Sequence, residues 1–105
     1  MSKYLFTLNY SADGSKGLLK EGGSSRETMA RKTIKSMGGS IECIYYALGA
    51  HDCYFICDLP DEKGAALGAM LLRSNGFTCS SVQLLTPAEI DEAVKATVDY
   101  TPPQG

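Results

Sequence analysis

Apolar and polar residues alternate along residues 3–10, where the even-numbered positions from Tyr4 to Tyr10 are aromatic or aliphatic. A period of two in a β-forming composition is typical of a strand with one buried face. Three further stretches have a comparable composition and are also predicted to be strands, at residues 40–48, 53–59 and 77–85. The adjoining Ser80 and Ser81 make the last stretch the least regular, which favours a bulge or an edge position there.

Two helical segments are predicted between the first and second strands. Residues 17–20 suit a short helix that Asp13 or Ser15 can cap, and a pair of glycines interrupts it. Ser24 and Glu27 then have the spacing of a capping box, so a second helix is expected to start there. The positions at helical spacing in this second helix are Ala30, Thr33, Ile34 and Met37.

A third helix is predicted after Asp61, where the preceding proline ends a strand. Its apolar stripe is predicted to be Ala66, Leu67, Met70 and Leu71. The clearest helix start lies near the C-terminus, where Thr86, Pro87 and Glu89 have the positions of an N-cap, a first-turn proline and a capping-box glutamate. The buried stripe predicted for this short terminal helix is Ile90, Ala93, Val94 and Thr97.

The predicted order of elements is strand, helix, strand, strand, helix, strand, followed by the terminal helix. This order is the split βαβ arrangement of ferredoxin-like folds. Residues 49–52 are short enough for a hairpin connection, which makes the second and third strands antiparallel. We therefore predict that residues 1–105 form a single α+β domain, a ferredoxin-like βαββαβ fold with an antiparallel four-stranded sheet and an added C-terminal helix.

Apolar residues occupy both faces of the predicted strands rather than one. Besides the residues of one face, Leu5, Ile44, Tyr46, Tyr54 and Ile56 place apolar surface on the other. Helices can cover one face of such a sheet, and a second copy of the sheet is the simplest cover for the other. The pattern predicts a two-fold homodimer with the sheets face to face. The alternative is a monomer with a tyrosine-rich exposed face, since tyrosine tolerates partial exposure.

Composition and charge narrow the class of protein. The 105 residues are 44% hydrophobic and 21% charged, as in a soluble globular domain, and the formal net charge is -2 with a pI near 5.3. This balance provides no basic field for nucleic acid or anionic lipid. No apolar run approaches the length of a membrane span, and the N-terminus does not resemble a signal peptide. We expect a cytoplasmic protein that binds neither nucleic acid nor membrane.

The four cysteines are predicted to be thiols in the core rather than disulfides or metal ligands. No export signal accompanies them, and a domain of this size does not need disulfides. Cys53 and Cys57 lie on the same predicted strand, where their sulfurs would be roughly 13 Å apart, too far to share one zinc ion. We expect no metal and no cofactor.

The hairpin carries a recognisable motif. Gly49, Ala50, His51 and Asp52, set between two aromatic strands, resemble the motif of the GYD-domain family, with His51 where that family has tyrosine. The resemblance extends through residues 4–6, 17–26, 58–61, 84–87 and 98–103. It implies a ferredoxin-like subunit of the dimeric α/β-barrel superfamily, in agreement with the pattern. It implies no particular reaction, because the wider superfamily includes cofactor-free oxygenases, isomerases and ligand-sensing modules.

Candidate catalytic residues are few. His51 is the only histidine, and Asp52 beside it suggests a general base oriented by a carboxylate. Adjacent strand residues point to opposite faces, however, so these side chains meet only if the hairpin is irregular. In the alternative interpretation, Asp52 accepts backbone hydrogen bonds in the turn and His51 lies at the rim.

Candidate ligand-binding residues are Arg26, Tyr45, Tyr46 and His51. Arg26 follows the glycine pair, where it can face an anion beside a helix N-terminus or can simply be solvated. Clustered tyrosines on neighbouring strands can line a cleft or fill a dimer interface. The cluster comprises Tyr4, Tyr45, Tyr46 and Tyr54.

These observations predict a cytoplasmic homodimer or higher oligomer that binds a small molecule or serves as a sensing or assembly module. The second hypothesis is a cofactor-independent oxygenase or isomerase that acts on a small apolar or aromatic substrate with His51 as the base. A purely structural protein is the third. The sequence alone does not choose among them, and it leaves open whether the protein is an enzyme.

Overall fold

Four strands form one antiparallel sheet in the computed structural model, which describes residues 1–103. The strands are β1 (Ser2–Asn9), β2 (Ser40–Tyr46), β3 (Cys53–Leu59) and β4 (Thr78–Leu84). Their order across the sheet is β2-β3-β1-β4, with each neighbouring pair antiparallel. The predicted α+β ferredoxin-like fold is confirmed, and β4 lies at the edge that its irregular sequence suggested.

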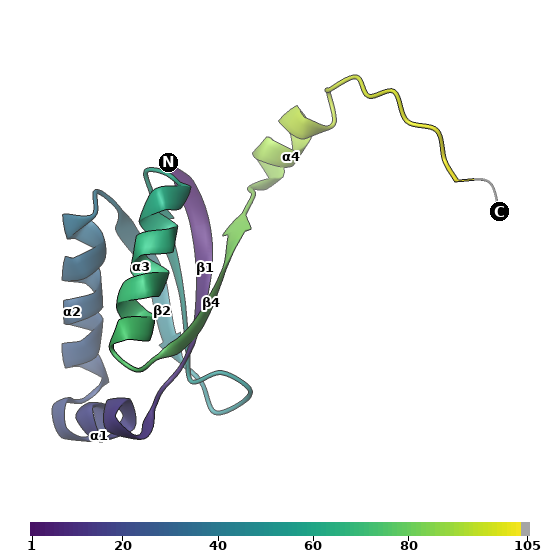
Figure 1. Ribbon diagram of the computed structural model, residues 1–105. Coiled ribbons are helices and arrows are strands. Elements are labelled where there is room, and N and C mark those ends of the chain that lie inside the picture. The colour runs from purple at the N-terminus through teal and green to yellow at the C-terminus, as the bar shows by residue number, and fades with distance from the viewer. Residues whose placement is uncertain (104–105) are drawn as a thin grey trace.

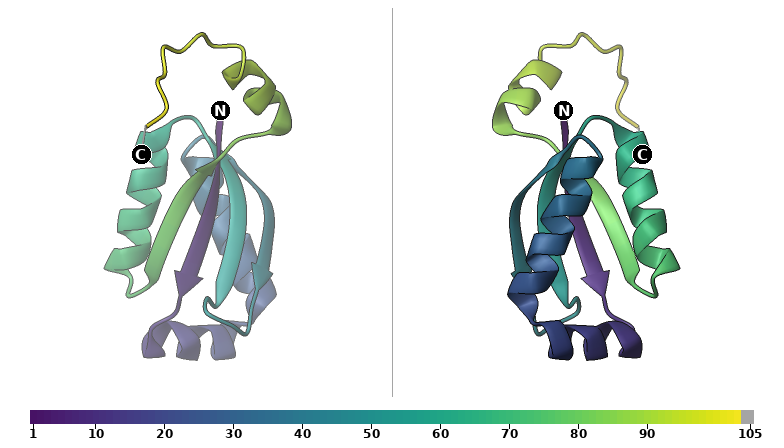
Figure 2. Two further views of the ribbon diagram at one scale, coloured as in Figure 1. Left: turned by 90° about the vertical axis from the view of Figure 1, so that its right-hand side faces the viewer. Right: turned by 90° about the vertical axis from the view of Figure 1, so that its left-hand side faces the viewer.

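Four helices accompany the sheet: α1 (Ala12–Glu21), α2 (Gly23–Ser36), α3 (Glu62–Ser74) and α4 (Pro87–Ala93). Figure 2 shows α2 and α3 side by side on one face of the sheet, with α1 across one end of this layer. Within residues 1–103, no helix covers the other face, which we call the open face (Figure 1). The C-terminal helix α4 stands beyond the end of β4, apart from both layers (Figure 1).

The N-terminal caps of the first two helices differ from the prediction. Ser11, not Asp13 or Ser15, caps α1 by accepting a hydrogen bond from the Gly14 N–H. The second helix starts at Gly23 without a side-chain cap. Gly22, with a φ of 83°, is both the last cap of α1 and the first cap of α2, so the two helices follow each other directly. Ser24 therefore lies inside the first turn of α2 and forms no capping box.

The core lies between the sheet and the two helices. Phe6 and Phe55 stack at its centre with ring centroids 4.9 Å apart and an interplanar angle of 7°. Three of the cysteines, Cys53, Cys57 and Cys79, are buried free thiols, as predicted. The fully buried side chains with the largest volumes are Phe6, Cys57 and Leu59.

A bulge in β2 corrects the predicted alternation of that strand. Ile41 pairs with Cys57 and Cys43 with Ile56, so the register shifts by one residue at Glu42. Beyond the shift, Ile44 and Tyr46 join Ile41 on the helix-covered face, while Cys43 and Tyr45 lie on the open face. Simple alternation had put Cys43 and Tyr45 on the same face as Ile41. The pairing of β4 with β1 has no such shift.

Two predicted apolar stripes are not buried. In α3 the buried residues are the small Ala65 and Gly68, whereas Leu67 is 47%, Met70 58% and Leu71 43% exposed. In the terminal helix α4, the capping box is present as predicted, but no residue is buried. The reason is that the chain leaves β4 pointing away from the two layers, so this stripe stands clear of the sheet and of α2 and α3 (Figure 1).

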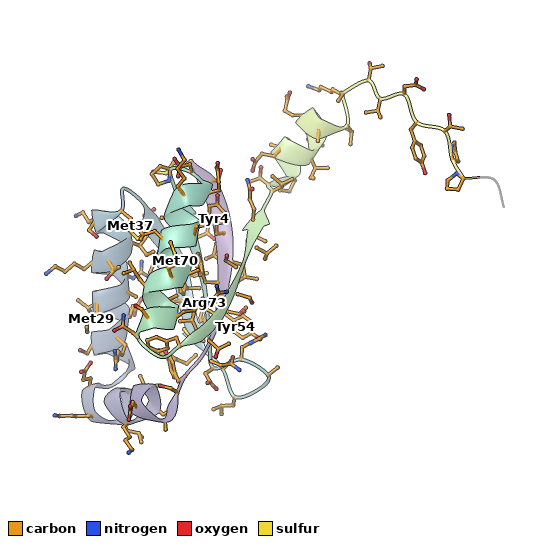
Figure 3. All side chains as sticks on the ribbon, in the orientation of Figure 1. Tyr4, Met29, Met37, Tyr54, Met70 and Arg73 are labelled. Carbon is orange, nitrogen blue, oxygen red and sulfur yellow. The ribbon has the colours of Figure 1, made fainter. Side chains whose placement is uncertain are left out.

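The open face is a mixture of apolar and polar residues. Leu5 and Ile56 are half-buried by their neighbours near its middle, and Val82 is exposed. At one end the Lys3 ammonium lies 3.0 Å from a Glu42 carboxylate oxygen. Figure 3 shows the two sides of the sheet, with Met29 on the helix side and Tyr54 on the open side. In the described part of the chain, no helix is long and apolar enough to cross a membrane.

Candidate functional site

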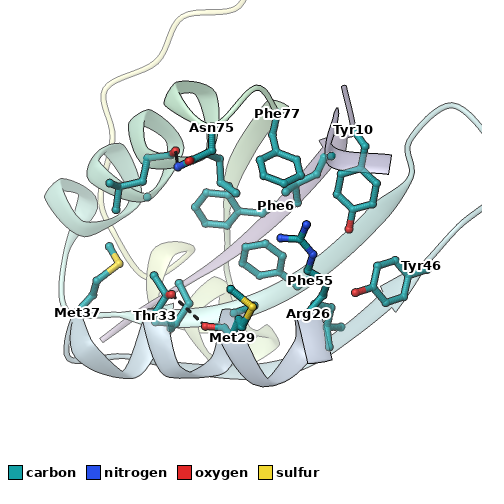
Figure 4. A pocket seen from close by; sticks show the side chains of 18 of the residues that line it. Phe6, Tyr10, Arg26, Met29, Thr33, Met37, Tyr46, Phe55, Asn75 and Phe77 are labelled. Carbon is teal, nitrogen blue, oxygen red and sulfur yellow. Dashed lines mark hydrogen bonds between the residues drawn. The ribbon is translucent and has the colours of Figure 1, made fainter. Parts of the chain in front are cut away.

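A pocket of about 490 Å³ opens between α2 and α3, with the sheet as its floor (Figure 4). This volume lies in the range of small-molecule sites in proteins. The pocket exists because the two helices do not close over the sheet: α3 presents Gly68 to it, and a Cβ there would lie 3.8 Å from the Met37 methyl and 3.9 Å from the Phe6 ring. The absence of a side chain at this position leaves the space open.

The floor and the long walls of the pocket are apolar. Phe6 and Phe55 form the centre of the floor, and Met29 and Met37 project from α2 above it (Figure 4). The remaining apolar lining residues are Leu8, Ala30, Ile34, Ile44, Leu71, Leu72 and Phe77. A flat or branched hydrocarbon would replace water over this surface at a gain of about 25 cal/mol for each Å² that it buries.

Two polar residues on the long walls each donate a side-chain hydrogen bond to a backbone carbonyl oxygen of their own helix. The Thr33 hydroxyl donates to the Met29 carbonyl oxygen at 3.0 Å. The Asn75 side-chain amide donates to the Leu71 carbonyl oxygen at 2.8 Å. Because these donors are used within their own helices, they add little polarity to the middle of the pocket.

The polar groups of the pocket gather at the end nearest α1. Figure 4 shows the Arg26 guanidinium and the hydroxyls of Tyr10 and Tyr46 converging there, and Asp13 also lines this end. A guanidinium only donates hydrogen bonds, with several N–H groups, and a phenol can donate its one proton, so donors predominate among the converging groups. The pocket therefore has an apolar body and a donor-rich end.

Arg26 is held in place by α1. Its Nε lies 3.3 Å from a Glu21 carboxylate oxygen, which leaves the two terminal nitrogens of the guanidinium for other partners. A Cβ at Gly17 would overlap the Arg26 guanidinium, so glycine at this position gives the side chain its space. Residues of α1 thus position the one cation among the residues that line the pocket.

The two tyrosines are also fixed by their surroundings. The Tyr46 hydroxyl donates to the Gly23 carbonyl oxygen at 3.2 Å, and the Tyr10 ring packs edge-on against Phe77 with centroids 5.1 Å apart. Burial raises the pKa of the Tyr10 phenol far above its ordinary value and also raises that of Tyr46. Both phenols therefore keep their protons at neutral pH. The Tyr46 proton is used in the bond to Gly23, whereas no such bond to a carbonyl oxygen takes the Tyr10 proton within residues 1–103.

The structure brings together only part of the predicted ligand-binding set. Arg26 and Tyr46 line the same end of the pocket, whereas Tyr45 lies on the open face opposite Tyr54. Tyr4 is buried on the helix side, so the four clustered tyrosines divide between the two faces of the sheet. The β2 bulge and the strand alternation cause this division.

His51 and Asp52 make separate interactions rather than a dyad. The His51 Nδ1 lies 2.9 Å from the Asn9 side-chain oxygen, and its ring meets Tyr54 edge-on at 5.6 Å. The Asp52 carboxylate accepts a hydrogen bond from the Tyr10 N–H at 2.8 Å. His51 borders a shallow hollow of the open face near Asn9, on the other side of the sheet from the pocket.

The backbone of the hairpin is tied to the end of β1 as well. The Asp52 N–H donates to the Leu8 carbonyl oxygen at 2.8 Å, and the Asn9 side-chain nitrogen donates to the Ala50 carbonyl oxygen at 3.2 Å. Together with the Asp52 carboxylate, these bonds fix the path of the chain from β1 into Tyr10. The hairpin therefore positions Tyr10, a pocket residue that the sequence analysis did not select.

Metal binding finds no support in the arrangement of side chains. Within residues 1–103, no three His, Cys, Asp or Glu side chains lie close enough together to hold a metal ion. Burial raises the pKa of the Cys57 thiol to about 11, so this sulfur remains a neutral core group.

A sequence profile of the GYD domain matches residues 4–94, which is most of the chain. The chain belongs to the GYD domain family. No curated protein and no solved structure matches it. In this GYD domain, the hairpin motif reads Gly49-Ala50-His51-Asp52, and its aspartate holds the Tyr10 backbone while its histidine holds the Asn9 side chain.

Proposed function

We propose that this GYD domain is a homodimeric small-molecule-binding domain whose ligand occupies the pocket between α2, α3 and the sheet. The ligand has an apolar body of one or two rings or a short branched chain, and a head rich in hydrogen-bond acceptors, such as a carboxylate or a carbonyl. The observation that carries the proposal is the pocket itself, an apolar cavity with donors converging at one end.

Binding is favoured over turnover by the position of the only histidine. His51 lies across the sheet from the pocket, and its Nδ1 is engaged by Asn9. The donors that do converge on the pocket end, Arg26 and Tyr10, orient an acceptor rather than abstract a proton at neutral pH, and the Arg26 charge neutralises a carboxylate. A domain of this kind suits ligand sensing.

Self-association is supported by the open face. Leu5 and Ile56 lie at its middle, while Val82 is 54% and Tyr45 70% exposed. Covering these residues with the same face of a second copy would bury apolar surface on both chains around a two-fold axis. Sedimentation tests this directly: Val82→Glu is expected to yield monomers, whereas Gln83→Glu, which adds the same charge on the opposite side of the same strand, leaves the dimer intact.

Ligand binding is tested with a panel of one- and two-ring aromatic carboxylates, each paired with its methyl ester and its parent hydrocarbon, followed by calorimetric titration. The wild-type chain is expected to bind members of the panel with one site per chain. Arg26→Met is expected to weaken carboxylate binding about tenfold or more while hydrocarbon binding changes little.

Lys32→Met provides the matched control, because it removes a cation from an exposed position on the same helix. Equal losses of carboxylate affinity in Arg26→Met and Lys32→Met would mean that Arg26 acts only through the net charge of the chain. A panel with no binding member would overturn the proposed pocket.

A further inference from the structure

The C-terminal residues 85–103, which we call the arm, extend away from the two layers. They leave the sheet at the end of β4 and project on the side of the open face (Figure 1). Figure 3 shows the side chains of the arm standing clear of those of the two layers. The arm includes the helix α4 and, over residues 97–103, a segment without helix or strand.

The arm carries apolar side chains that remain largely exposed among residues 1–103. Ile90 and Val94 are one helical turn apart and are 46% and 75% exposed. The other exposed apolar residues of the arm are Leu85, Val98 and Tyr100. An arm that remained in solvent would have no need of this repeated apolar spacing.

The helix α4 itself needs a packing partner. It has seven residues, and isolated helices shorter than about 12 residues are marginal in water even with favourable sequences. The capping box of Thr86 and Glu89 satisfies backbone groups at its first turn but supplies no packing. Burial of its apolar side against another surface would supply the missing stability.

We infer that the arm packs on a second copy of this chain, so that the arm of each subunit of the homodimer lies on the surface of the other subunit. This inference rests on the proposed face-to-face dimer. The arm projects on the open-face side, where that second copy would sit, and Val82 on β4 continues the exposed apolar surface from the arm into the open face (Figure 1). A two-fold axis makes the exchange reciprocal.

The charge distribution is compatible with a second copy as the partner. Four of the twelve acidic residues of the chain lie in the arm, but only one of its ten basic residues does. The arm is therefore acidic, whereas the rest of the chain has nine basic and eight acidic residues, so the body of a partner subunit does not repel the arm through net charge. The acidic residues of the arm are Glu89, Asp91, Glu92 and Asp99.

The location of the arm is tested by photo-cross-linking. The photo-reactive residue p-benzoylphenylalanine replaces Tyr100 in the full chain, and the protein is irradiated at a concentration at which sedimentation reports dimers. Cross-linking between subunits doubles the mass of the 11.2 kDa chain, and we expect this product to dominate. Dimers whose cross-links leave the mass unchanged would overturn the arm exchange and leave the dimer standing. A monomer at every concentration would overturn both.

The contribution of the arm to the stability of the dimer is tested with a matched pair of double variants in this part of the arm. Ile90→Ser with Val94→Ser removes the apolar side of the arm, and four side chains change in each dimer. The dissociation constant of the dimer is expected to rise about 100-fold. Glu92→Ser with Lys95→Ser removes an exposed ion pair without altering net charge, and is expected to change the constant less than about threefold. Equal dissociation constants for the two variants would overturn the arm exchange.

Discussion

Replacing Gly68 by alanine should stabilise the fold and, at the same time, reduce the pocket. Gly68 lies in the middle of α3 and faces the sheet. A methyl group there would lie 3.8 Å from the Met37 methyl carbon and 3.9 Å from the Phe6 ring, which are ordinary van der Waals distances. The new side chain therefore fits without displacing its neighbours, and it occupies space that the pocket now holds.

The expected gain in stability comes mainly from the backbone. Glycine in a helix interior costs about 0.8–1.0 kcal/mol relative to alanine, largely through its freedom in the unfolded chain. The added contacts with Met37 and Phe6 have the same sign. We expect the free energy of unfolding to rise by about 1 kcal/mol, which raises the melting temperature by about 4–8 °C in a domain of this size.

The assay combines thermal unfolding with titration of an aromatic carboxylate that binds the wild-type chain. Gly64→Ala is the control, since it makes a comparable change in α3 beside Leu59, with its nearest contact at 3.7 Å, and lies outside the pocket. Both variants should unfold at higher temperature, but only Gly68→Ala should bind the carboxylate more weakly. A lower melting temperature for Gly68→Ala would refute the packing at this position, and unchanged affinity would refute the placement of the ligand.

Three further predictions concern stability. Asp52→Ala removes the acceptor of the Tyr10 N–H, and should lower the free energy of unfolding by about 1–2 kcal/mol in urea titrations; an unchanged midpoint would contradict the role given to the hairpin. Gly39→Ala would drive a Cβ into the Asp58 carbonyl oxygen, so this variant should be severely destabilised or fail to fold; wild-type stability would show that the backbone relaxes there. Burial raises the pKa of Cys57 from 9.0 to about 11, so the folded chain holds this proton more tightly than the unfolded chain. This contribution to the free energy of unfolding is fully present below about pH 9 and is lost as pH rises through 11, a decrease of about 2–3 kcal/mol. In urea titrations, the free energy of unfolding of Cys57→Ala should therefore fall less over this pH range than that of the wild-type chain.

Local signals in the sequence predicted much of the fold. The capping box at Thr86 depends on residues within one turn, and the structure contains it as predicted. The third strand has the predicted bounds of Cys53–Leu59, because a continuous aromatic and β-branched run between a turn and a proline leaves little choice. The order of these elements was sufficient for the ferredoxin-like topology.

Features that depend on distant contacts were not predictable in this way. The β2 bulge arises where Ile41 and Cys43 pair with adjacent residues of β3, and nothing in the β2 sequence marks it. In α3 the larger Leu67 and Met70 favour one side for burial, yet the small Gly68 faces the sheet and leaves a pocket there. A prediction from apolar spacing takes the largest apolar residues as the buried ones, and this prediction is wrong where the fold contains a pocket lined by a small residue.

The candidate site was predicted only in part for the same reason. Arg26 and Tyr46 drew attention by residue type, and the structure places both at the donor-rich end. The sequence predicts Tyr10 only as the last residue of a strand. Its role depends on the hydrogen bond from its N–H to Asp52, which is far along the chain. No local pattern connects Tyr10 with Arg26, since their meeting depends on how α1 turns at Gly22.

Amide chemical-shift mapping of the full chain, with the aromatic carboxylate that binds most tightly, tests the central claim most directly. The account predicts that the largest shifts fall on residues around the pocket, at Phe6, Tyr10, Arg26 and Gly68, with little change at Tyr45 and Ile56 on the open face. Shifts centred on the open face, or none at saturating concentrations of every compound in the panel, would contradict it.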